Sequence, residues 1–303
     1  MFNKLRKITG RFIGQGLLTI GLFFLAASAT ADQYGDWTYT DNGSTITITK
    51  YTGTGSNVTI PSMINSKQVT IIGNGTFSYY SSLTGVVIPD SVTSIGDGPG
   101  AGAFAYCTSL SSVTIGSGVA SIGDAAFYGC SSLQDVVIPD SVTSIGSTAF
   151  AESGLTGIVI PNSVTSLGDS AFWQCYYLKS VMIGSGITSI GIQMFYNCGL
   201  TSIVIPNNVT GIGDNAFYGC GGLTSATIGS GVKSIGASAF FQCSNLTGVT
   251  IPDNVTSIGD SAFTYCSGLT GVTIGSGVTS IGVQAFYYCS SLTSFSVSSN
   301  NPN

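Results

Sequence analysis

Residues 110–130 read LSSVTIGSGVASIGDAAFYGC, and variants of this stretch fill most of the 303-residue chain. Its clearest marker is a phenylalanine, which recurs at positions 77, 104, 127, 150, 172, 195, 217, 240, 263 and 286. The intervals are 27, 23, 23, 22, 23, 22, 23, 23 and 23 residues, and an insertion at residues 96–101 lengthens the first. A fixed period of this length indicates a solenoid, in which each repeat is one supersecondary unit.

Local patterns assign a conformation to each part of the period. Val113 and Ile115 alternate with polar residues, as in a half-buried strand. Gly116, or Pro139 in other copies, then ends the strand, because proline lacks the amide donor and glycine permits a sharp turn. Asp124 is well placed to cap one or two turns of helix. Each period therefore predicts one coil of strand, turn, short return and helical turn. A single coil cannot bury its apolar side alone, so successive coils must stack.

The sequence divides into three parts. Residues 1–31 have a cationic start, an apolar run and an A-x-A-like end at Ala29-Thr30-Ala31, which predicts a secretory signal peptide; a retained N-terminal anchor is the alternative. Residues 32–76 contain Ile60-Pro61 but have irregular spacing, and we expect them to cap the apolar end. Residues 77–303 form a solenoid of about ten coils, the last one incomplete. No further apolar stretch is long enough to cross a membrane once the signal peptide is removed.

Composition excludes several classes of function. Charged residues are 7% of the chain, against about a quarter in an ordinary soluble domain. The chain has no His, and Glu152 is its only glutamate, so neither a His-based catalytic pair nor the commonest zinc ligand is available. The pI of 4.3 argues against nucleic-acid binding. Without residues 1–31 the net charge is 4 − 13 = −9. We expect no enzyme, no cofactor and no metal.

Two kinds of coil alternate, because some copies carry Ile-Pro after the strand and others carry Ile-Gly-Ser-Gly. The shared skeleton, L-x-x-V-x-I-P-x-x-V-x-x-I-G-x-x-A-F-x-x-C, resembles the BspA-like leucine-rich repeat over about residues 45–299. The resemblance implies a leucine-rich-repeat solenoid with a parallel strand ladder on its concave face. It also implies an exported bacterial protein, secreted or at the cell surface, that binds host or matrix proteins or other cells. No sorting signal follows the last copy, which leaves surface attachment open.

Eight cysteines occupy one position of the period, and Ser153 or Gly154 replaces them in one coil. One interpretation is buried free thiols, because unpaired Cys is among the most buried residue types. The alternative is bridges between adjacent coils, such as Cys243 with Cys266.

Two surfaces are candidates for binding. The first is the outward strand positions on the concave face, although Val and Thr also simply suit strands. The second is an aromatic stripe beside the repeated Phe, for which partial burial against neighbouring coils is the alternative. The concave candidates are Val87, Thr114, Asp135, Val137, Val159, Met182, Val204, Thr227, Thr250 and Thr273, and the stripe is Tyr128, Trp173, Tyr196, Tyr218, Phe241 and Tyr287.

Aspartates after Ile-Gly form a series that could cap helical turns or hold calcium, and we expect capping. They are Asp97, Asp124, Asp169, Asp214 and Asp260. For function, the sequence favours a non-enzymatic adhesion or protein-binding protein. The alternative is a structural envelope or matrix protein whose solenoid ends associate. The repeats contain no obvious position that breaks their pattern.

Overall fold

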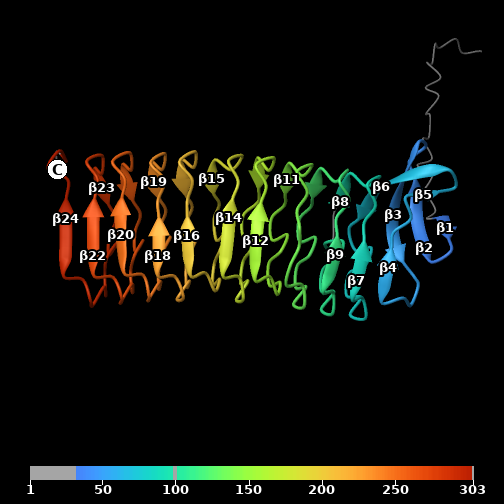
Figure 1. Cartoon of the computed structure of the whole chain (residues 1–303), viewed down its shortest axis with the longest axis horizontal. Coiled ribbons are helices and arrows are strands. Elements are labelled where there is room, and N and C mark those ends of the chain that lie inside the picture. The colour runs from blue at the N-terminus through green and yellow to red at the C-terminus, as the bar shows by residue number, and fades with distance from the viewer. Residues whose placement is uncertain (1–31, 98–100, 302–303) are drawn as a thin grey trace, which may run out of the picture. The chain divides into compact units, whose positions relative to one another are not determined.

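The computed structural model describes residues 32–97 and 101–301, which form a solenoid of stacked coils. The coils lie side by side along the array, and their strands run in parallel (Figure 1). The predicted signal peptide at residues 1–31 lies outside the described residues. Ten coils contain the repeated Phe and one more follows, so the fold class predicted from the periodicity is confirmed.

Most coils contribute one strand to a first row, where equivalent residues pair in parallel. Val87 lies opposite Thr114, and Val159 lies opposite Met182. As predicted, the apolar residues of these strands point into the core and the residues between them point outward. The strands are β4 (Asn57–Thr59), β7 (Gly85–Val87), β9 (Ser112–Thr114), β12 (Gly157–Ile160), β14 (Ser180–Ile183), β16 (Ser202–Val204), β18 (Ser225–Thr227), β20 (Gly248–Ile251), β22 (Gly271–Ile274) and β24 (Ser294–Val297).

A second row consists of short strands that begin with Ser or Gly and pair in parallel from coil to coil, as Ile122 does with Ile145. The Ile at this position is buried in most coils. The strands are β8 (Ser94–Asp97), β10 (Ser121–Ile122), β11 (Ser144–Ile145), β13 (Ser166–Leu167), β15 (Ser189–Ile190), β17 (Gly211–Ile212), β19 (Ser234–Ile235), β21 (Ser257–Ile258) and β23 (Ser280–Ile281).

The N-terminal strands extend the second row and cover the first Phe of the series. The first three strands, β1, β2 and β3, form an antiparallel meander. Strand β3 then pairs in parallel with β6, and β6 pairs in parallel with β8. The rings of Trp37 and Tyr51 lie 6.0 and 5.3 Å from that of Phe77. Apolar surface at this end is thereby buried. The strands are β1 (Asp32–Tyr34), β2 (Trp37–Asp41), β3 (Thr45–Tyr51), β5 (Met63–Ile64) and β6 (Lys67–Gly73).

The core is organised around the repeated Phe, whose rings form one continuous stack. From Phe77 to Phe286, neighbouring ring centroids lie 5.0–5.7 Å apart with interplanar angles of 2–16°. Offset parallel rings at this spacing attract one another, and each ring also removes its neighbours from water. The spacing matches the distance between paired strands. Stacked coils therefore share one core, as expected.

The predicted helical turn is wrong. No helix occurs in the described part of the chain, and residues 124–129 form consecutive turns instead. Ala125 has a positive φ of 52° and Gly129 one of 69°. These turns donate to the next coil: the N–H groups of residues 125, 127 and 129 bond to the carbonyls of residues 147, 149 and 151 at 2.7–2.9 Å. A left-handed non-glycine residue costs about 1–2 kcal/mol, which these intercoil bonds offset.

Helix capping by the aspartates is therefore also wrong. The Oδ1 of Asp124 accepts a hydrogen bond from the Ser147 N–H at 2.7 Å, in the next coil rather than in its own. The neighbouring coil supplies the free N–H that a helix N-terminus would otherwise have supplied. Asp169, Asp214 and Asp260 form the same bond at 2.7–2.8 Å, and the side chain of Asp97 lies outside the described part.

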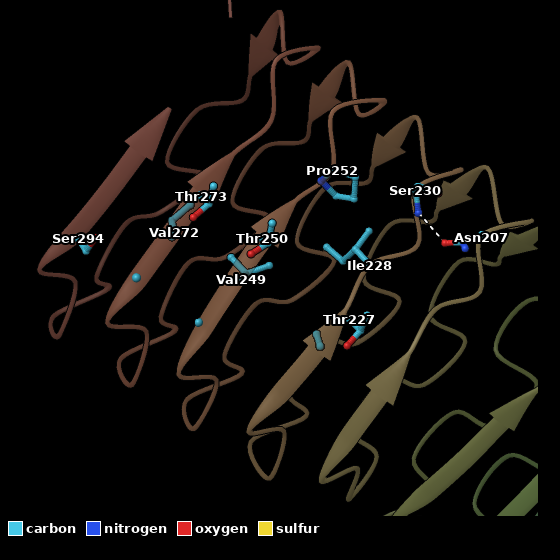
Figure 2. A pocket seen from close by; sticks show the side chains of 13 residues that line it. Asn207, Thr227, Ile228, Ser230, Val249, Thr250, Pro252, Val272, Thr273 and Ser294 are labelled. Atoms are coloured by element: carbon cyan, nitrogen blue, oxygen red, sulfur yellow. Dashed lines mark hydrogen bonds between the residues drawn. The ribbon is translucent and has the colours of Figure 1, made fainter. Parts of the chain in front are cut away.

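The alternation of two kinds of coil has a similar cause. The residue after the proline accepts a hydrogen bond from the Ser N–H of Gly-Ser-Gly in the next coil, as Asn207 does from Ser230 at 2.9 Å (Figure 2). The second glycine then lies directly on the preceding coil, because a Cβ on Gly231 would be 1.9 Å from the Asn207 carbonyl oxygen. Ile-Pro-Asx and Ile-Gly-Ser-Gly are thus two halves of one intercoil contact.

Candidate functional site

The cysteines are free thiols that bond along the stack. Each of the eight S–H groups donates to the carbonyl of the Phe in the preceding coil, with Sγ···O distances of 3.1–3.3 Å. Burial raises the pKa of Cys107, Cys220 and Cys266 to about 12. A protonated, buried thiol is a poor nucleophile and a poor metal ligand. Ser153 occupies the position in the one coil without Cys, and its Oγ lies 3.4 Å from the Sγ of Cys175.

Residues 32–97 and 101–301 hold no group of three Cys, Asp or Glu side chains that could bind a metal ion, and the sequence has no His. The aspartates considered as calcium ligands are held by backbone N–H groups instead. The same residues include no helix that could span a membrane. The geometry therefore directs attention to the surfaces that the coils present.

All ten candidate residues of the first strand row are exposed. They differ along the array, because the middle coils carry large apolar side chains and the later ones carry Thr. Val137, Val159, Met182 and Val204 lie in four consecutive coils and are 81, 56, 66 and 63% exposed. Their neighbours on the same face are mostly Ser or Gly, so nothing shields the apolar side chains. Asp135 is the one charged residue among the ten.

The later half of the row is hollowed. A depression of about 700 Å³ lies over β18, β20 and β22, and Thr227, Thr250 and Thr273 line it (Figure 2). Gly248 and Gly271 leave the strand backbone open to an approaching molecule. A flat surface or an extended strand could lie closely on this face.

The structure brings four of the six predicted stripe residues into one ladder. Trp173, Tyr196, Tyr218 and Phe241 stack in sequence, with centroids 4.7–6.2 Å apart. These ring faces contact one another, and all four side chains are half-buried. Tyr128 lies apart from them, and its hydroxyl donates to Glu152 at 2.8 Å. The ladder supports the interpretation that these rings pack against neighbouring coils.

The ladder includes rings that sequence reasoning missed. It continues through Tyr265 to Tyr288, which lie one position further along the period than Phe241. Tyr287 is outside the main column and contacts Tyr288 at 4.2 Å. The signal was a second aromatic position, two residues after the repeated Phe, where the backbone has a positive φ in Tyr265 and Tyr288.

The expectation that no position breaks the pattern is also wrong. The first row is unpaired between β14 and β16 and between β18 and β20, but between β9 and β12 the strand itself is missing, because residues 133–138 form none. The sequence signals near this coil were the 22-residue interval from Phe150 to Phe172 and the replacement of Cys by Ser153. Hollows of about 590 and 390 Å³ lie beside this coil, and both are lined by Ser131, Gly154 and Tyr177.

Comparison with known proteins agrees with this architecture. No curated protein matches the chain. Among solved structures, a leucine-rich repeat protein from T. pallidum is 29% identical, with a TM-score of 0.54 over 72% of this chain and 91% of that one. Another from Eubacterium ventriosum is 26% identical, with a TM-score of 0.54 over 87% and 83%. A leucine rich cell surface protein from Faecalibacterium prausnitzii is 28% identical, with a TM-score of 0.43 over 89% and 95%.

The family comparison covers nearly all of the described coils. The model for the BspA type leucine rich repeat region matches residues 42–99, 100–222 and 210–303. The repeated Ile-Pro, Ile-Gly and Ala-Phe elements are the residues that build the strands, the intercoil contacts and the Phe stack. The chain therefore belongs to the BspA-type leucine-rich repeat family.

Proposed function

We propose that this protein is an exported, non-enzymatic binding protein that contacts other proteins through its first strand row. The observation that carries the proposal is the run of exposed apolar side chains at Val137, Val159, Met182 and Val204. Contiguous exposed apolar residues on a polar surface mark interaction sites in soluble proteins. Ser and Gly beside them allow a partner backbone to approach closely.

Export is supported by the signal-peptide pattern of residues 1–31. The family's association with adhesion favours a host or matrix protein as the partner. The absence of His and the use of the aspartates as backbone acceptors both disfavour catalysis.

The test is binding to a panel of immobilised, purified extracellular-matrix proteins. For any protein that binds, Met182→Lys should weaken the affinity by at least about tenfold, because it places a charge in the centre of the apolar run. Thr250→Lys adds the same charge to the polar half of the row and should change the affinity less than about twofold. Equal affinity of Met182→Lys and the unmodified chain would contradict the proposal.

The same preparation also tests the structural alternative. Sedimentation velocity over a range of concentrations should show one discrete species if the chain is a binding protein. Species that grow steadily with concentration, combined with no binding to the panel, would favour assembly through the ends of the solenoid.

A further inference from the structure

One coil departs from the repeat in several ways at once. Ser153 replaces the usual Cys, Glu152 is the only glutamate of the chain, and residues 133–138 form no strand. Backbone pairing of this strand segment to the next coil is limited to the bond from the Thr156 N–H to the Gln134 carbonyl at 2.9 Å, as it also is between β14 and β16 and between β18 and β20. Residues 135–138 have no backbone hydrogen bond to another described residue. The departures lie close together, so they change one place on the surface.

A shortened loop makes a notch at this place. Gly154 alone connects Ser153 to Leu155, where the coil before it has Ser131 and Ser132 and the coil after it has two tyrosines. The short loop lies directly on its neighbour, because a Cβ on Gly154 would be 2.2 Å from the Ser131 carbonyl oxygen. The two longer loops form the walls, and hollows of about 590 and 390 Å³ adjoin above Gly154. We call this hollow the Gly154 notch.

The aromatic rings of the notch differ from those elsewhere in the coils. Tyr176 and Tyr177 are 55 and 65% exposed, and neither contacts another ring. Every other described aromatic residue from Phe77 onward does contact a ring, so its face is covered at least in part. No other ring therefore covers Tyr176 or Tyr177, and both side chains are exposed to solvent. Exposed rings of this kind favour binding surfaces, since they combine an apolar face with a polar hydroxyl.

The remaining lining is polar, and three of its side chains are unpaired. Gln134, Gln174 and Asp135 line the two hollows, and their side chains form no hydrogen bond with a described residue. Most other aspartates of the coils accept a backbone N–H from the next coil, so Asp135 lacks the structural role that its counterparts have. No Lys or Arg lines either hollow.

We propose that the Gly154 notch binds a glycan. A pyranose ring has an apolar C–H face that packs on an aromatic ring, here Tyr176 or Tyr177. Its hydroxyl groups both donate and accept hydrogen bonds, which matches the amides of Gln134 and Gln174 and the carboxylate of Asp135. A cationic peptide fits less well, because neutral hydroxyl and amide groups outnumber the two carboxylates. Glu152, the second carboxylate, also accepts the Tyr128 hydroxyl at 2.8 Å.

The test is to probe a printed array of defined oligosaccharides with the purified chain and to measure the strongest hit by calorimetry. Tyr177→Ala should weaken the affinity for that oligosaccharide by at least about tenfold. Tyr79→Ala removes a comparably exposed ring outside the notch and should leave the affinity within about twofold. Met182→Lys should also leave it unchanged, which separates this site from protein binding by the strand row.

A loop insertion gives a second, independent variant. One Ser inserted after Gly154 restores the two-residue loop of the neighbouring coils, so the chain should fold while the notch is filled. The control is one Ser inserted after Gly268, which lengthens a loop that lines neither hollow. Glycan binding should be lost in the first insertion and kept in the second. Binding of no oligosaccharide, equal binding by both insertions, or binding only to a lysine-rich peptide would overturn the proposal.

Discussion

Two stretches of the solenoid differ in whether their side chains contact the next coil. In residues 200–231, Asn207 accepts the Ser230 N–H, and Gly231 lies against the Asn207 carbonyl. In residues 133–162, the coil with Pro139 is followed by another proline coil, and the side chain of Asp140 bonds to no described residue. The comparison teaches that contact with the next coil dictates the regular positions. Where that contact is lost, packing does not restrict the surface residues, and they can differ from the repeat.

The largest expected effect tests whether the irregular coil keeps its core. Phe217→Ala should lower the free energy of unfolding by about 3–5 kcal/mol, because the ring is fully buried between two others. Phe150→Ala should cost as much, because its ring is equally buried and stacked. Urea denaturation followed by circular dichroism measures both. A much smaller cost at Phe150 would show that the irregular coil is loosely packed.

A second variant tests the contact between the two kinds of coil. Gly231→Ala should destabilise the fold by about 1–3 kcal/mol, since its Cβ would overlap the backbone oxygen of Asn207. The matched control is Gly248→Ala in β20, where the nearest atom to a Cβ is 3.7 Å away, and it should change stability by less than about 0.5 kcal/mol. Equal costs from thermal melts would refute the account of the Gly-Ser-Gly motif.

The next largest effect on stability is expected from substitution of the cysteines. Cys243→Ala should cost about 1–2 kcal/mol, because it removes the bond to the Phe217 carbonyl and leaves a small void. Cys289 is only half-buried, so Cys289→Ala should cost less. Ellman's reagent should react slowly with the folded chain and titrate all eight thiols after denaturation without reductant. Fewer than eight reactive thiols would show that some cysteines are bridged.

The smallest effect is the dependence of stability on pH. The Ser276 N–H lowers the pKa of Asp253, so this carboxylate stabilises the folded chain above about pH 4 and the contribution is lost as pH falls through the lowered pKa. Asp253→Asn should melt normally at pH 7 and lose less stability in acid. Asn207 forms the same bond in its own coil, so the substitution keeps an acceptor. An unchanged acid profile in melts between pH 7 and pH 3 would contradict this.

The period of the Phe and the alternation around Val113 and Ile115 were enough to predict the solenoid, the first strand row and the buried Cys position. These features depend on apolar side chains, whose spacing is visible along the chain. The turn after Asp124 was predicted as helix, because Asp before an apolar residue is typical of a helix start. Its actual partner, the Ser147 N–H, is 23 residues away, and local patterns do not reveal such a bond.

One candidate site was predicted from the sequence and the other was not, because local patterns do not reveal contacts between coils. Exposure of Val159 and Met182 follows from strand alternation, so the strand row could be found from the sequence. The short loop at Gly154 is visible in the sequence as a 22-residue interval, but the hollow above it is not, because its shape depends on how the neighbouring loops pack. Whether an aromatic ring such as Tyr177 is free depends on its neighbours in the adjacent coils.

One set of backbone hydrogen bonds at the turns, at and around the repeated Phe, runs in a single direction. From coil to coil, the N–H of residues such as Phe217 and Phe240 points to a carbonyl of the following coil, at 2.7 Å in both cases. Aligned amide dipoles add along the array, as they do in a helix. The turn edge of the solenoid therefore carries a macrodipole whose positive pole lies toward the later coils. Anionic groups that approach this edge should meet a more favourable potential near Tyr265 than near Tyr106.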